Sequence, residues 1–395
     1  MYEGTAPASP GATLAILCLI ATVGLAGSFL YLPALPMMAE SFDASEPAAQ
    51  ATLTAFLVGS CLGFALYGRA ADRFGHRLAF AVAGAVFVAA SVAAAMSADI
   101  TQLVAARLVQ GAGSVAGIVT ARATIRTTMP PGRAMQSMAL LTAVVSLSPA
   151  ASPLIGAAVL QVTDWRATFL VAAGLGLAGI LGALRVLPRH VPVLPQDRPH
   201  RAEATILRSP QFRAALMIGI ASNAAFVVMM AATPFVFVET FGYSPAAYAA
   251  LIAVILTVFA AIALVSGRLA ARFGAARPIG WGIVPVLAGA ALLVAGSLGT
   301  PSPTLIAPGL LLLIGCMGLM VPNAHILMLE PFPAFAGTAA GLAMLITTAG
   351  GALAITLYSL LAAGSVAGFG LFTACCGGAT LIGWAALQGT ERTFP

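Results

Sequence analysis

The sequence contains no lysine, and only 8% of its 395 residues carry a charge. Apolar residues make up 60% of the chain. Soluble domains, by comparison, are about 25% charged and about 45–50% apolar. This chain therefore has too few polar side chains to cover a soluble fold. That argues against a soluble enzyme, a nucleic-acid-binding protein and a secreted disulfide-linked domain.

Residues that carry chemistry are also scarce. The five cysteines all lie within apolar stretches and lack the spacing of metal ligands, which is typical of small packing residues. There is no H-E-x-x-H motif, no pair of adjacent aspartates and no G-x-x-x-x-G-K-[ST] phosphate loop. We expect no catalytic residue, no metal and no cofactor, and we keep an intramembrane enzyme or a sensor as a remote alternative.

Long apolar runs dominate what the sequence does contain. A membrane-spanning helix needs about 20 apolar residues, and twelve runs of suitable length follow one another with short connections. The runs cover residues 12–35, 49–68, 78–97, 101–122, 135–160, 167–187, 213–238, 247–266, 278–298, 304–329, 336–363 and 366–388. They predict an all-α membrane protein with twelve transmembrane helices in two pseudo-symmetric six-helix bundles.

The longest polar interruption, residues 185–213, divides these runs into six and six. It is rich in proline and arginine, and such sequence does not enter a bilayer as a helix. We predict an N-terminal bundle over residues 1–187, a cytoplasmic linker over 188–212 and a C-terminal bundle over 213–395.

The arginines predict the orientation of the chain in the membrane. All 18 basic residues are arginine, and in a twelve-span arrangement 16 of them fall on one side. The other side holds only Arg166, while Arg107 lies inside a span. Because arginine-rich loops stay in the cytoplasm, we expect a multi-pass protein of the cell inner membrane with both termini cytoplasmic.

A short motif occurs once in each half. Residues 68–75 and residues 267–274 share the pattern G-R-x-A-x-R-F-G, 199 residues apart, between the second and third spans of each half. Internal duplication is a recurring plan of membrane transporters. The second copy has Ala271 where the first has Asp72.

The first copy has a mechanical interpretation as a gate. Gly68 and Gly75 permit a tight turn and a close approach of two helices, and Arg73 and Arg77 hold the loop in the cytoplasm. Asp72 can pair with an arginine or interact with the positive N-terminal end of another helix. The alternative is a plain turn whose charges only set topology.

Taken together, these features resemble the major facilitator superfamily over nearly the whole chain. The motif around Asp72 is similar to that superfamily's loop signature between helices 2 and 3. Further motifs are similar to its Bcr/CflA branch of bicyclomycin and chloramphenicol/florfenicol resistance exporters. They are Tyr31-Leu32-Pro33, Arg107-Leu108-Val109-Gln110-Gly111, Ser152-Pro153, Asp164-Trp165-Arg166, Pro322-Asn323 and Leu329-Glu330-Pro331. The resemblance implies a drug exporter in which Asp72 contacts helix 11 when the cytoplasmic side is closed.

Arg107 is the first candidate for solute contact, because a charge inside a span is costly and is retained for function by default. With Gln110 and Ser114 it forms one polar line on its helix. The alternative is an arginine whose head reaches water at the membrane boundary. The other candidates are polar or aromatic residues within apolar runs, for each of which packing is an equal alternative: Phe29, Tyr31, Asn223, Phe226 and Asn323.

The chain departs from the family where protons are concerned. Phe29 stands where relatives usually carry an aspartate in helix 1, so the obvious proton-carrying carboxylate is missing. His325, whose ordinary pKa of about 6.5 suits a proton carrier, is one candidate, and its alternative is a neutral histidine bonded to a backbone carbonyl freed by Pro322. Glu239, Glu330 and Arg107 complete the candidates for proton coupling.

The sequence thus predicts a secondary transporter, acting as a monomer, that exports drugs or small amphiphilic metabolites by alternating access in exchange for protons. The alternative on the same fold moves an anionic or neutral solute with little proton coupling, because Arg107 has no embedded carboxylate beside it in the sequence. The expected partners are a small-molecule solute, protons and the lipid bilayer, without nucleic acid.

Overall fold

The structure is a computed structural model that describes residues 10–187, 202–332 and 336–393. Within these residues the regular secondary structure is helical throughout. Twelve of the helical segments are long and apolar enough to cross a membrane. The predicted fold class is therefore confirmed. The physical reason is that a helix satisfies all its own backbone hydrogen bonds, which lipid cannot do for it.

The chain divides into two compact units, residues 1–44 with 55–195 and residues 45–54 with 196–395. Nothing in the sequence predicts that residues 45–54 group with the second unit. Most of the predicted linker, residues 188–201, lies outside the described residues, and the domain boundaries stay a prediction.

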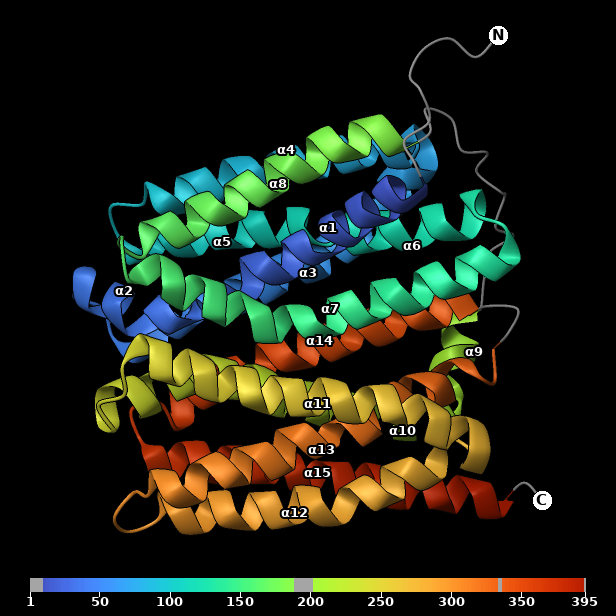
Figure 1. The fold of residues 1–395 in the computed structure, drawn as a ribbon. Coiled ribbons are helices and arrows are strands. Elements are labelled where there is room, and N and C mark those ends of the chain that lie inside the picture. Colours follow the sequence, from blue (N-terminus) through green and yellow to red (C-terminus); the bar gives the residue numbers. More distant parts are fainter. Residues whose placement is uncertain (1–9, 188–201, 333–335, 394–395) are drawn as a thin grey trace, which may run out of the picture. The chain divides into compact units, whose positions relative to one another are not determined.

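The helices of the first half pack around α1. In chain order they are α1 (Pro10–Phe29), α2 (Leu35–Ser41), α3 (Glu46–Phe74), α4 (His76–Ala95), α5 (Ile100–Ser114), α6 (Ala116–Thr128), α7 (Pro131–Leu160) and α8 (Arg166–Val186). Helix α1 contacts α5, α6, α7 and α8, and α4 lies side by side with α8 (Figure 1).

Two predicted spans of this half are interrupted. The first ends as α1 at Phe29, and a 3-10 turn over Leu32–Ala34 then leads into α2. The fourth is divided at Val115 into α5 and α6. Near this break the Ser114 hydroxyl donates to the Gly111 carbonyl at 2.7 Å. A glycine next to a serine that binds its own helix backbone is a common cause of a kink.

The second half follows a similar plan. Its helices are α9 (Ala202–Arg208), α10 (Pro210–Pro234), α11 (Pro245–Phe273), α12 (Ala276–Ser297), α13 (Pro303–Leu329), α14 (Ala336–Leu361) and α15 (Val366–Thr393). Helix α10 packs on α13, α14 and α15, and α12 packs on α13 and α15 (Figure 1). A π-helical turn over Phe235–Thr240 follows Pro234, which lacks the backbone N–H of a regular helix.

The repeated motif has the same backbone geometry in both halves. Gly75 lies at φ 81°, ψ 152° and Gly274 at φ 82°, ψ 156°. Each of these glycines donates its N–H to the carbonyl four residues earlier at 2.9 Å. This region of backbone space is essentially restricted to glycine, which explains why glycine stands at both positions.

Candidate functional site

Arg107 is fully buried within the first unit. It stands two turns into α5, a helix that begins behind Asp99, whose side chain accepts the Gln102 N–H at 2.8 Å. Its side chain is 0% exposed and is the largest fully buried side chain of the described residues. The alternative in which Arg107 extends to water therefore does not fit the structure.

The guanidinium belongs to a chain of hydrogen bonds that links three helices. Arg107 Nη1 donates to the Gly27 carbonyl of α1 at 2.7 Å and to the side-chain oxygen of Gln110 at 2.5 Å. Gln110 Nε2 in turn donates to the Ser91 hydroxyl of α4 at 2.7 Å, and that hydroxyl donates to the Phe87 carbonyl. The polar chain therefore holds α1, α4 and α5 together through buried groups.

Aromatic rings enclose the same cation. The guanidinium carbon lies 4.2 Å from the ring centroid of Tyr31, 4.3 Å from that of Phe56 and 5.7 Å from that of Phe169. All three side chains are buried. Ring faces attract a cation, most strongly where water is absent. We call Arg107, Gln110, Ser91 and these three aromatic residues the arginine cage.

A close approach of α3 and α5 places Phe56 over the cation. A Cβ at Gly111 would overlap the carbonyl of Phe56, and one at Gly59 would overlap the carbonyl of Leu108. Small residues let membrane helices pack this tightly. The hydroxyls of Ser60 and Ser114 lie 3.2 Å apart across the same contact.

The structure brings three of the five predicted solute contacts of this half into the cage, namely Tyr31, Arg107 and Gln110. Phe29 is buried as well, and Ser114 lies one helical turn beyond Gln110, against α3. Ser91, Phe56 and Phe169 were not predicted from the sequence. The only signal for Ser91 is a hydroxyl within an apolar run, and the two phenylalanines give none.

The predicted contacts of the second half are separate from one another. Asn223 of α10 donates to the Thr347 carbonyl of α14 at 2.8 Å. Asn323 of α13 is fully buried and donates to the Ser266 hydroxyl of α11 at 2.6 Å. Phe226 is half-buried. Both asparagines thus join neighbouring helices in this structure.

Of the candidates for proton coupling in the second half, only His325 is partly enclosed. Its Nδ1 lies 2.9 Å from the Val321 carbonyl, one turn earlier in α13. His325 thus contacts a backbone carbonyl, but this is not the carbonyl that Pro322 frees, which is that of Gly318, four residues before the proline. Glu239, in the π-helical turn, and Glu330, which caps α13, are both exposed.

The gate motif shows different partners for its two later arginines. Arg77 Nη2 donates to the Leu184 carbonyl near the end of α8 at 2.7 Å. Arg73 is exposed and lies over the ring of Phe74, 5.3 Å from its centroid. Gly68 lies within α3 with open space beside it. The side chain of Asp72 lies outside the described part of the chain, so its predicted contact stays a prediction.

Comparison with known families identifies the chain. Residues 17–355 match the Major Facilitator Superfamily. The chain belongs to this superfamily. It is accordingly a multi-pass membrane protein of a transporter family, a class that moves small-molecule solutes and is not a class of enzymes.

Several superfamily members resemble the chain in sequence. It is 28% identical to Multidrug resistance protein D of Escherichia coli over 380 residues, which is 95% of each protein. It is 27% identical to the uncharacterized MFS-type transporter YdgK of Bacillus subtilis and 25% identical to Multidrug resistance protein MdtL of Escherichia coli. The matches span 65% of YdgK and 62% of MdtL.

Solved structures of superfamily members share the fold. A bacterial homolog of the human lysosomal transporter Spinster, in an inward-facing and occupied conformation, matches with a TM-score of 0.77 at 17% identity over 99% of this chain and 98% of that one. A D-xylose-proton symporter matches with a TM-score of 0.76 at 17% identity over 95% of each chain. At this identity the likeness shows the major facilitator fold alone.

Proposed function

We propose that this superfamily member exports drugs or small amphiphilic metabolites by alternating access, as an antiporter that takes up protons, in the manner of the Bcr/CflA branch. The observation that carries the proposal is the 28% identity to a multidrug resistance protein across 95% of both chains. The arginines, 16 of which fall on one side of a twelve-span arrangement, support an inner-membrane protein with cytoplasmic termini. We propose that it works as a monomer.

The arginine cage is the first unit's proposed solute contact. Arg107 keeps its charge at any relevant pH, so the cage cannot be the group that takes up and releases protons. A buried guanidinium among ring faces does suit planar or aromatic solutes with a polar edge. Because Arg107 is 0% exposed, we propose that the cage opens in another state of the transport cycle.

In the second unit, Asn323, Asn223 and Phe226 stay weaker candidates for solute contact, because both asparagines already hold helix partners in this state. The gate residues Gly68, Asp72, Arg73, Gly75 and Arg77 are proposed to close the cytoplasmic side.

His325 is the proposed proton carrier. Histidine is the side chain best suited to bind and release a proton near neutral pH, and the His325 ring lies within α13, with Nδ1 2.9 Å from the Val321 carbonyl. The competing proposal, a transporter of an anionic or neutral solute with little proton coupling, is favoured by the fixed charge of Arg107. If His325 does not carry the proton, Glu239 and Glu330 are the next candidates for proton coupling.

Everted membrane vesicles test the proposal. A resistance and accumulation screen, with and without the expressed protein, first identifies a transported compound. Its uptake into vesicles is then measured with the pH gradient imposed and collapsed. We expect uptake to depend on the gradient in the parent protein, and His325→Ala to remove this dependence while binding is retained.

The matched control is Gln211→Ala, which removes a polar, non-titrating side chain that joins α10 to α13 in the same unit and belongs to no proposed site, and it should keep the gradient dependence. Uptake by the parent that ignores the gradient would support the uncoupled transporter. Equal gradient dependence in the parent and in His325→Ala would move the proton carrier to Glu239 or Glu330.

A further inference from the structure

The two copies of the repeated motif differ in the register of their last arginine. Counting 199 residues from Arg77 leads to Ala276, and the arginine of the second copy is Arg277, one residue later. The extra residue, Ala275, lies before α12, so Arg77 and Arg277 are each the second residue of their helix.

In the first unit, this arginine forms a contact between two packed helices. Arg77 of α4 donates to the Leu184 carbonyl of α8 at 2.7 Å. In the second unit, α12 packs on α15 as α4 packs on α8. Here Arg277 makes no hydrogen bond or ion pair within the described part of the chain, and it lines a cavity of about 320 Å³.

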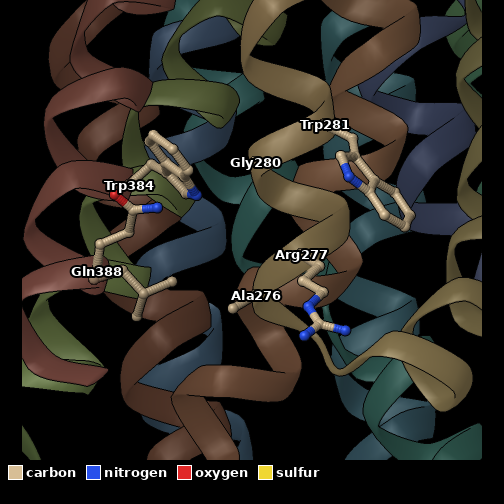
Figure 2. Close-up of a pocket in the computed structure, with 7 residues that line it drawn as sticks. Ala276, Arg277, Gly280, Trp281, Trp384 and Gln388 are labelled. Carbon is tan, nitrogen blue, oxygen red and sulfur yellow. The ribbon is translucent and has the colours of Figure 1, made fainter. Parts of the chain in front are cut away.

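The walls of this cavity are built by α12 and α15. Figure 2 shows Ala276, Arg277, Gly280 and Trp281 on one helix and Trp384 and Gln388 on the other, with Gly280 facing Trp384. The Trp384 indole lies against bare backbone, because a Cβ at Gly280 would approach its ring to 3.1 Å. Arg277 and Gln388 are both exposed at the cavity mouth.

Two of the three tryptophans of the chain, Trp281 and Trp384, line this one cavity. Indoles gather at the level of lipid headgroups, where an apolar ring and an N–H donor are both accommodated. Deeper in the membrane, Val284 continues the α12 wall one turn on and Leu381 continues the α15 wall one turn back, and both are exposed. The cavity thus passes from a charged mouth to an apolar surface.

We infer that this cavity binds the headgroup of an anionic phospholipid. Arg277 would bind the phosphodiester through its planar pair of N–H donors, Gln388 would donate to the ester oxygens, and the acyl chains would lie along Val284 and Leu381. Arg268 and Arg272, both exposed near the end of the preceding helix α11, add positive charge on the same side. Basic pockets between helices on the cytoplasmic side are typical of such lipid sites.

The lipid site shares no residue with the arginine cage or with the proposed proton carrier. Its test therefore does not depend on which solute is transported or on whether protons are coupled.

Tryptophan fluorescence tests the inference on the full chain. The protein is reconstituted into vesicles of phosphatidylcholine with a minor fraction of phosphatidylglycerol, and bromine atoms, which quench indole fluorescence, are carried by only one lipid at a time. Total composition and charge stay constant. We expect bromine on phosphatidylglycerol to quench about fivefold more per molecule, the preference that one arginine near a charged leaflet supplies.

Arg277→Gln should bring this preference close to onefold, whereas the matched variant Arg272→Gln, which removes the same charge from the last turn of α11, outside the cavity lining, should keep more than half of it. Trp384→Phe should remove most of the lipid-specific signal. Gly280→Val fills the cavity without changing any charge and should abolish the preference if Arg277→Gln does not fold.

Equal loss in both arginine variants would show diffuse surface attraction and overturn the inference, as would equal quenching by the two lipids in the parent protein. An excess of inorganic phosphate should leave the signal unchanged. If it removes the phosphatidylglycerol preference, the cavity binds free phosphate and the lipid assignment is wrong.

Discussion

At the scale of single residues, Arg107 shows how a membrane protein holds a charge away from both water and lipid. One guanidinium nitrogen, Nη1, donates hydrogen bonds to two oxygen acceptors. The ring centroids of Tyr31 and Phe56 lie 4.2 and 4.3 Å from the guanidinium carbon. These contacts need a flat cation with several donors. An ammonium group is a compact charge without that geometry.

Replacing Arg107 with lysine should therefore impair the protein even though the charge is kept. We expect Arg107→Lys to lower transport at least about tenfold, the loss of about 1.4 kcal/mol of interaction, at unchanged membrane insertion. Vesicle uptake of the screened compound measures it. Arg126→Lys, an exposed arginine at the end of α6, should stay near the parent rate. Full activity in Arg107→Lys would contradict a role that depends on guanidinium geometry.

The glycines of the repeated motif give a second prediction at this scale. Gly75→Ala and Gly274→Ala should each lower the free energy of unfolding by about 1–3 kcal/mol, because alanine is strained at their backbone angles. Neither change would meet another atom within 4 Å. Unfolding in mixed detergent micelles measures the loss.

Gly68→Ala is the control for both glycine variants. Gly68 also has open space beside it but lies within α3 at ordinary helical geometry, so alanine should be neutral or stabilise by about 0.5–1 kcal/mol. The same sign at all three positions would mean that backbone strain is not the cause.

At the scale of helices, the pair α4 and α8 differs from the pair α12 and α15 in one hydrogen bond made by an arginine. Arg77 joins the first turn of α4 to the last turn of α8, where the carbonyls at a helix C-terminus favour a cation. The pair α12 and α15 has a cavity lined by Arg277 instead.

Arg77→Gln should lower the free energy of unfolding by about 1 kcal/mol, at the low end for a charged hydrogen bond because the contact is partly exposed. Arg73→Gln, which removes an exposed arginine four residues earlier, should change it by less than about 0.5 kcal/mol. Micelle unfolding of the two variants side by side gives the comparison. Equal effects would show that the Leu184 contact does not stabilise the pair.

At the scale of the whole molecule, the arginine distribution predicts which loops share a side of the membrane. Single cysteines at positions 196 and 300, introduced into a variant without the five native cysteines, should react with a membrane-impermeant thiol reagent from opposite sides. We expect Gln196→Cys to be labelled in everted vesicles and Thr300→Cys in intact, outer-membrane-permeabilised cells, in line with the positive-inside rule. Labelling of both from the same side would contradict the twelve-span topology.

The sequence by itself determined the number of membrane-spanning helices, the repeat and the superfamily. Hydropathy is a property of about 20 neighbouring residues, and the motif from Gly68 to Gly75 is just as local, so neither depends on distant parts of the chain. The position of Arg107 inside a span could be predicted from the sequence for the same reason, because it depends only on the apolar residues around it.

The tertiary structure decided which residues surround that arginine. Gly27, Phe56, Ser91 and Phe169 come from four other helices, and Gly27 is 80 residues away in the chain. No periodicity predicts such contacts, because they depend on how closely helices approach, as α3 and α5 do at Gly111. Nor could the sequence predict that Arg277 lines a cavity, because the other wall of that cavity belongs to α15. A sequence orders side chains along single helices, and only packing determines which helices face each other.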